Sequence, residues 1–98
     1  MKVYIAGKIS GDPNYREKFA AEKDVLEDQG HIVLNPAELP EGLNAADYMR
    51  ICFAMIDCAE AVLFLPDWTS SEGAKLERAY CEYTDKLVVD EEEEDGEA

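Results

Sequence analysis

The sequence predicts an α/β fold of three layers, in which a small parallel sheet of four or five strands lies between two layers of helices. Four short apolar runs alternate along the chain with longer segments of helical spacing. The runs are apolar almost throughout, which is typical of parallel strands covered on both faces. The 98 residues are enough for one domain with one core.

The first half of the chain is predicted to form two strands and a helix. Residues 3–7, "V-Y-I-A-G", are a short apolar run ending in glycine and form the first strand. Asp12 and Pro13 are suited to the N-cap and first turn of a helix over residues 14–29, which Gly30 ends. Residues 31–36 form the second strand, which ends at Pro36 because a proline cannot continue the hydrogen-bond ladder.

The second half supplies two more helices and two more strands. Asn44 can cap a helix over residues 45–58 that is apolar around much of its circumference. We expect the sheet to cover one side of this helix and a second copy of the chain the other, which predicts a homodimer. A third strand lies within residues 59–66, a third helix spans 71–84, and a short fourth strand spans 87–90. Right-handed crossovers would make this a flavodoxin- or Rossmann-like doubly wound fold.

The acidic charge is uneven along the chain. The formal net charge is −14, and residues 90–98 hold seven acids and no base, so −7 remains for the body. We therefore expect one domain over residues 1–89 and a solvated, disordered tail over 90–98. An acidic body opposes binding to extended nucleic acid, although it leaves room for a small phosphorylated ligand held by a few local donors.

The sequence gives no reason to expect a membrane, a metal or a cofactor. Its longest apolar run is far short of a membrane span, and its N-terminus lacks the form of a signal peptide. Cys52, Cys58 and Cys81 show no paired metal-ligand spacing and are typical of reduced thiols in a cytosol. The reduced thiols lead us to expect a cytoplasmic protein. Because the chain has a single histidine, we also expect no bound metal.

The loop after the first strand is one candidate site, because ligands of open parallel sheets bind outside the carboxyl ends of the strands. Gly7 and Gly11 allow the backbone to approach a ligand, Lys8 adds a charge and Ser10 adds a hydroxyl. The loop matches neither a P-loop nor a dinucleotide fingerprint. It is therefore either an anion site or an ordinary turn.

The start of the third helix is the second candidate. Ser71 can cap the helix, Gly73 leaves its first turn open to an anion, and Glu77 lies on the same helical face as Gly73. Glu77 then either faces a bound ligand, or lies exposed and pairs with a nearby lysine or arginine.

Three further residues follow strands and could form the crevice wall. Asn35 could shape the wall or serve an ordinary turn, and Asp67 could reach the crevice. Trp68 could stack on a base or cover the edge of the core.

Residues 1 to about 90 resemble the nucleoside 2-deoxyribosyltransferase-like superfamily, and most closely an uncharacterised branch that is common in phages and bacteria. The stretches that bear this resemblance are "V-Y-I-A-G-K-I-S-G", "V-L-N-P-A-E-L-P", "Y-M-R-I-C-F-A-M-I-D-C-A-E-A-V-L-F-L-P" and "W-T-S-S-E-G-A-K-L-E-R-A". The match to the uncharacterised branch runs along nearly the whole body. The match to the characterised enzymes is confined to short motifs.

The resemblance implies a function for the candidate residues. The characterised enzymes exchange or hydrolyse the N-glycosidic bond of deoxynucleosides or their 5′-monophosphates, and a glutamate in a "G-x-x-x-E" helix attacks the anomeric carbon. By this resemblance Glu77 is the catalytic nucleophile, and Ser71 and Gly73 contact the 5′-phosphate. Residues 7–11 fall on the loop that lines the base and phosphate.

The sequence departs from these enzymes at the residue that assists the leaving base. Cys52 stands where the resemblance calls for an aspartate, and a thiol is a poor substitute for a carboxylic acid. The family's base-holding aspartate has no matching residue in this sequence, although Asp67, just past the third strand, could reach the crevice. The chain is thus expected to be a nucleoside or nucleotide N-glycosidase or deoxyribosyltransferase. The alternatives are a non-catalytic binder of a nucleotide-derived ligand, such as a phage-encoded sensor or sponge, or a structural role if side chains fill the crevice.

Overall fold

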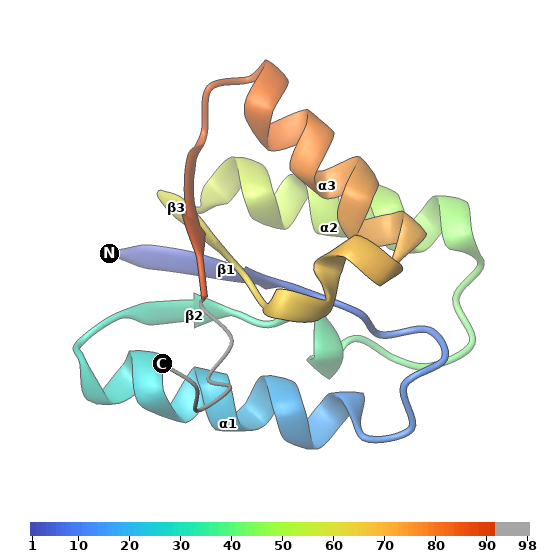
Figure 1. Cartoon of the computed structure of the whole chain (residues 1–98), viewed down its shortest axis with the longest axis horizontal. Coiled ribbons are helices and arrows are strands. Elements are labelled where there is room, and N and C mark those ends of the chain that lie inside the picture. The colour runs from blue at the N-terminus through green and yellow to red at the C-terminus, as the bar shows by residue number, and fades with distance from the viewer. Residues whose placement is uncertain (92–98) are drawn as a thin grey trace, which may run out of the picture.

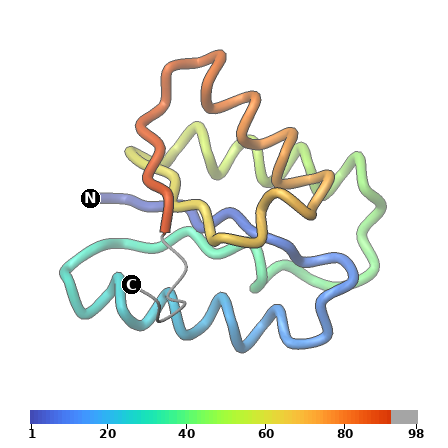
Figure 2. Tube along the Cα trace, viewed as in Figure 1, coloured from blue at the N-terminus to red at the C-terminus, as the bar shows by residue number. Residues whose placement is uncertain are grey.

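The computed structural model describes residues 1–91 and has the predicted three-layer α/β/α fold, with a four-stranded, all-parallel sheet in the order β2-β1-β3-β4 (Figure 1). The elements are β1 (Lys2–Ala6), α1 (Tyr15–Asp28), β2 (Ile32–Leu34), α2 (Ala45–Cys58), β3 (Ala61–Phe64), α3 (Glu72–Tyr83) and β4 (Leu87–Asp90), with short 3-10 turns η1 (Pro36–Glu38) and η2 (Pro66–Ser70). Helix α1 covers one face of the sheet, and α2 and α3 cover the other (Figures 1 and 2).

The core divides into two halves because side chains of a strand alternate between the faces of the sheet. Ile5 of β1 packs on the α1 side with Phe19. Its neighbour Tyr4 packs on the α2 and α3 side with Cys52 and Cys81. The Tyr4 side chain is fully buried, so its hydroxyl needs a partner inside the protein.

The structure corrects the predicted N-cap of α1 and the predicted end of β2, and it confirms the predicted cap of α2. The predicted N-cap Asp12 is wrong, because Asn14 occupies the N-cap position and the helix starts at Tyr15. The carboxylate of Asp12 instead accepts the backbone N–H of Asn14 at 2.9 Å and pairs with Lys18. Strand β2 ends two residues early, because Asn35 turns the chain into η1. The predicted cap of α2 by Asn44 is confirmed.

The predicted tail begins inside the described part of the chain. Asp90 closes β4, where it lies in register with Phe64, and the N–H of Glu91 donates to the Phe64 carbonyl at 2.9 Å. The rest of the predicted tail, from residue 92 onward, lies outside the described residues. No described helix is both long enough and apolar enough to cross a membrane.

The strand order positions the site. Strand β2 pairs with one edge of β1, and β3, which follows β2 in the chain, pairs with the other edge of β1. A crevice forms outside the carboxyl ends of strands where the order reverses in this way, here between β1 and β3. Figure 2 shows the loops after β1 and β2 and the turn before α3 gathered at this end of the sheet.

Candidate functional site

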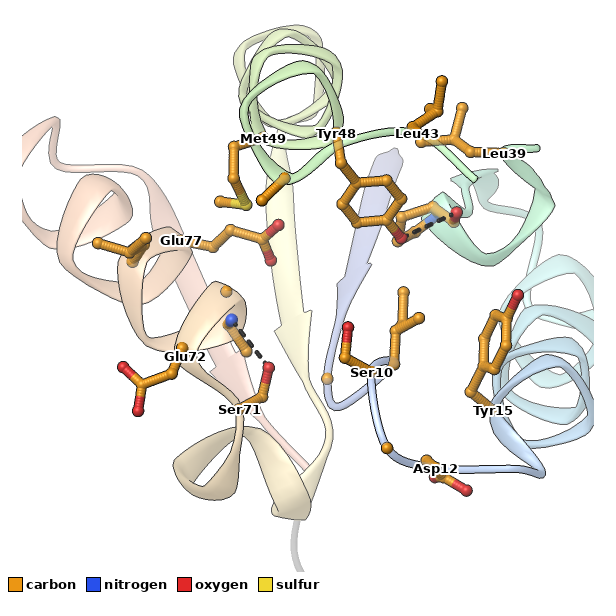
Figure 3. Close-up of a pocket in the computed structure, with 18 of the residues that line it drawn as sticks. Ser10, Asp12, Tyr15, Leu39, Leu43, Tyr48, Met49, Ser71, Glu72 and Glu77 are labelled. Carbon is orange, nitrogen blue, oxygen red and sulfur yellow. Dashed lines mark hydrogen bonds between the residues drawn. The ribbon is translucent and has the colours of Figure 1, made fainter. Parts of the chain in front are cut away.

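A pocket of about 1050 Å³ lies at the carboxyl ends of the strands (Figure 3). Its lining comes from the loop after β1, the loop between η1 and α2, and the first turns of α2 and α3. The volume is at the upper end of the range for small-molecule sites. Among the residues predicted from the sequence, it brings together Gly7, Ser10, Gly11, Ser71, Gly73 and Glu77.

Glu77 projects from α3 into this pocket (Figure 3). Its exposed fraction is only 5%, so it is not the exposed, ion-paired glutamate that was the alternative. The hydroxyl of Tyr4 donates a hydrogen bond of 2.9 Å to Glu77 Oε2. A carboxylate is costly to bury unless it is satisfied, so this bond is part of what permits Glu77 to sit in the core.

The surroundings of Glu77 change its acidity. Burial raises the pKa of its carboxyl from 4.5 to about 7, and hydrogen bonds with Tyr4 and Cys52 oppose the rise. At neutral pH the group is therefore divided between its neutral and ionised forms. A carboxyl poised in this way can act as a nucleophile in its ionised form or exchange protons in its neutral form.

Cys52 lies on α2, beside Glu77 and Tyr4. Its side chain is fully buried, and burial raises the pKa of the thiol to about 12. The thiol is therefore protonated at every physiological pH, and Cys52 is not part of the pocket lining. The aspartates of α2 are not substitutes, since Asp57 accepts from the Tyr80 hydroxyl and Asp47 pairs with Arg50, both outside the pocket.

The N-terminus of α3 opens onto the pocket beside Glu77. Ser71 is its N-cap, and the Ser71 Oγ accepts the N–H of Ala74 at 3.1 Å. In the described part of the chain, the N–H groups of Glu72 and Gly73 have no acceptor, as is usual at a helix start. A Cβ on Gly73 would lie 3.6 Å from the sulfur of Met49, an ordinary contact, so glycine here leaves space rather than prevents a clash.

The loop after β1 forms the opposite wall and requires two of its glycines. A Cβ on Gly7 would come within 3.0 Å of the Leu65 side chain. Gly11 has a φ of 86°, a left-handed conformation that side chains rarely adopt. Ser10 between them is exposed and faces the pocket (Figure 3).

An ionic cluster holds this loop against η2. Lys18 Nζ pairs with Asp12 at 2.6 Å and with Asp67, and it also donates to the carbonyl of Lys8 at 3.0 Å. Asp67 accepts the backbone N–H of Lys8 at 3.0 Å. Lys8 and Asp67 therefore connect the two loops and do not line the pocket.

Residues 1–90 match the model of a family described as a domain of unknown function, DUF4406. The chain belongs to this family. A search of curated proteins finds no match.

The DUF4406 domain places the last two predicted wall residues away from the pocket. Asn35 is buried, and its side chain accepts the N–H of Ala37 at 2.9 Å, which stabilises the turn into η1. Trp68 packs edge-on against Phe64, with ring centroids 5.6 Å apart, and Arg78 lies over its ring. Trp68 thus covers the edge of the core, the other of the two roles considered for it.

Two tyrosines that the sequence did not single out for the site form its aromatic side. Tyr15 of α1 and Tyr48 of α2 line the pocket across from Glu77 (Figure 3). The Tyr48 hydroxyl donates to the carbonyl of Pro36 at 3.3 Å, which fixes the ring against η1. Aromatic residues of helices usually belong to the core, so only the fold could distinguish these two.

The described residues contain no group of three or more histidine, cysteine, aspartate or glutamate side chains that could hold a metal ion. The three cysteines are free thiols.

Proposed function

We propose that the pocket binds a nucleoside-type ligand, either a nucleoside or its 5′-monophosphate, and that Glu77 attacks the anomeric carbon of its sugar. By this proposal the DUF4406 domain would be a member of the nucleoside 2-deoxyribosyltransferase-like superfamily, which its motifs resemble. The observation that carries the proposal is the position of Glu77, a carboxyl group 5% exposed that nevertheless points into a cavity of about 1050 Å³.

The two sides of the pocket suit the two ends of a nucleoside. Tyr15 and Tyr48 offer apolar rings on one side, where a base can stack. Ser10, Ser71 and the free N–H groups at the start of α3 offer donors on the other side, where the 5′ end of a sugar would lie. Glu77 lies beside these donors, where it would face the sugar ring.

The proposed reaction is a two-step displacement. The ionised carboxylate of Glu77 forms a bond to the anomeric carbon while the bond to the base nitrogen breaks, and the departing base takes up a proton from solvent water. Water then hydrolyses the glycosyl ester, or a second base displaces Glu77 and completes a transfer. A carboxyl with a pKa of about 7 supplies the ionised form at neutral pH.

A non-catalytic binder is the second candidate, and Cys52 favours it. The thiol at this position is fully buried, protonated and outside the pocket lining, so it cannot readily give a proton to a leaving base. On this alternative the same cavity retains its ligand intact, as a sensor or sponge would.

One experiment separates the candidates. The protein is incubated with the four 2′-deoxynucleosides, the four ribonucleosides and their 5′-monophosphates, and free base is measured by chromatography while ligand binding is followed by thermal denaturation. Base release by the wild type and by Glu17→Gln, but not by Glu77→Gln, supports the enzyme; Glu17 is exposed on α1 and is a matched control. Thermal stabilisation without base release supports the binder, and neither effect with any compound refutes both.

We also propose that the protein is a cytoplasmic homodimer. Ile51 of α2 and Leu76 and Tyr83 of α3 are exposed by 37%, 56% and 92%, which leaves apolar area on the helical layer for a second copy to cover. Free thiols agree with a reducing compartment. Light scattering should give twice the 11.0 kDa of one chain at micromolar concentration, and a monomer mass would contradict the dimer.

A further inference from the structure

The charged residues that line the pocket are all acidic. Among the described residues, its lining contains four acidic residues and no lysine, arginine or histidine; the four are Asp12, Glu41, Glu72 and Glu77. Sites that recognise phosphate by side chains commonly use arginine or lysine, often with a bidentate guanidinium. The donors available here are hydroxyls and backbone N–H groups.

The cations nearest to the pocket are already paired. Lys18 is held between Asp12 and Asp67, and Arg16 pairs with Glu41 at 3.3 Å. Lys75 lies 3.8 Å from Glu72. Each of these contacts compensates a carboxylate of the protein, so none of the three cations is free to balance a dianionic ligand.

Lys8 is the remaining cation near the loop, and its position does not change this balance. A Cβ on Gly11 would be 4.0 Å from Lys8 Nζ, so the ammonium lies beside Gly11 but does not line the pocket. A single, partly exposed ammonium group contributes little to the binding of an anion.

The start of α3 is weakened as an anion site by its own first residue. A helix N-terminus attracts anions because its dipole and free N–H groups are positive. Here Glu72 occupies the first turn and puts a carboxylate at that same end, pointing away from the cavity (Figure 3). A phosphate at this position would also lie near Glu77, which is charged in part at neutral pH.

We infer that the sugar end of the pocket takes an uncharged group, so that the ligand is a nucleoside with a free 5′-hydroxyl rather than a nucleotide. This inference rests on the proposed function, because it presumes a nucleoside-type ligand, and it selects between the two ligand classes that the function allows. Ser10, Ser71 and the N–H groups of α3 then bind a hydroxyl group, for which neutral donors and acceptors suffice. Nucleotides bind weakly because no free cation lines the pocket to balance the phosphate, and because Glu77, which has no cation partner among the described residues, repels it.

The sign of the salt effect is the test. Dissociation constants are measured by calorimetry for 2′-deoxyadenosine, thymidine and their 5′-monophosphates at 50 and 500 mM NaCl. We expect each nucleoside to bind at least about tenfold more tightly than its monophosphate at low salt. High salt should narrow this gap, because screening reduces repulsion between the phosphate and the carboxylates. A phosphate held by positive groups would behave in the opposite way.

Glu72→Gln and Glu17→Gln form a matched pair for the same measurement. Both residues are acids in the first turn of a helix, but only Glu72 belongs to the helix whose first turn lines the pocket. We expect Glu72→Gln to tighten monophosphate binding several-fold relative to nucleoside binding, and Glu17→Gln to leave this ratio as it is in the wild type.

Each outcome decides between the hypotheses. Tighter binding of the monophosphate, or a monophosphate affinity that falls with salt, overturns the inference and leaves the proposed function standing. An equal response of both variants also overturns it, since the effect would then be one of overall net charge. Binding of neither compound overturns the proposed function and, with it, the inference.

Discussion

Replacement of Glu77 by glutamine should remove a pH-dependent destabilisation of the fold. The pKa of Glu77 is raised from 4.5 to about 7, chiefly by burial. Each pKa unit corresponds to about 1.4 kcal/mol, so the folded state should lose about 3 kcal/mol of stability as the pH rises from below 4.5 to above 7. The sign follows because the buried neutral acid is favoured, and ionisation in the folded state is the costly step.

The neighbours of Glu77 should not titrate in this range. Tyr4 of β1 and Tyr48 and Cys52 of α2 all have pKa values raised by burial, with Cys52 at about 12, so they stay neutral between pH 5 and 8. Glutamine keeps an acceptor for the Tyr4 hydroxyl, which now donates to Glu77 Oε2 at 2.9 Å. The substitution thus removes the charge and keeps the hydrogen bond.

The assay is urea denaturation of wild type and Glu77→Gln at half-unit steps from pH 5 to pH 8, above the isoelectric point of about 4.2. Because other carboxyls titrate equally in both proteins, the difference between the two unfolding free energies isolates Glu77. This difference should grow in favour of the variant by about 2–3 kcal/mol across the range. A difference that stays constant with pH would show that Glu77 ionises as an ordinary exposed acid, and would refute the argument.

Three further substitutions test the contacts around the pocket by denaturation. Tyr4→Phe removes the only hydroxyl bonded to the Glu77 carboxylate in the described structure and should cost about 1–3 kcal/mol; an unchanged stability would contradict a buried bond. Lys18→Met leaves two neighbouring carboxylates without their shared cation and should cost about 1 kcal/mol, less at high salt, and a salt-independent loss would argue against an ionic role. Ser71→Ala removes the cap of α3 and should cost about 1 kcal/mol, whereas Ser70→Ala, whose hydroxyl only bonds the Asp67 carbonyl, should cost less; equal losses would refute the assigned cap.

The fold could be predicted because its determinants are local. Apolar runs such as that of β3 and helix signals such as Asn44 are set by neighbours in the chain, and the structure confirms both. The predicted N-cap of α1 failed because the Asp12 side chain takes other partners. Asp12 is a good N-cap by type, but Lys18 and the N–H of Asn14 compete for its carboxylate, and the helix begins later.

The candidate site was predicted only in part. The position of Ser71, Gly73 and Glu77 at a helix start was visible from their spacing, and so was the glycine loop after β1. The sequence could not decide whether Glu77 faced solvent or a cavity, because helical spacing gives relative directions along one helix and not the identity of the face that is covered. Asp67 and Trp68 follow β3 and have side chains that could bind a ligand. In the structure, however, Asp67 pairs with Lys18, and Trp68 packs against Phe64 at the edge of the core.

By itself, then, the sequence determined the parallel α/β fold and the segments that bear the candidate site, because periodicity and capping are properties of adjacent residues. Only the tertiary structure decided how Glu77 behaves. The Tyr4 hydroxyl, 73 positions away along the chain, and Cys52 on a third element meet Glu77 when the sheet and two helices pack. Burial among them, and not the local sequence, moves its pKa to about 7 and turns an ordinary glutamate into a candidate nucleophile.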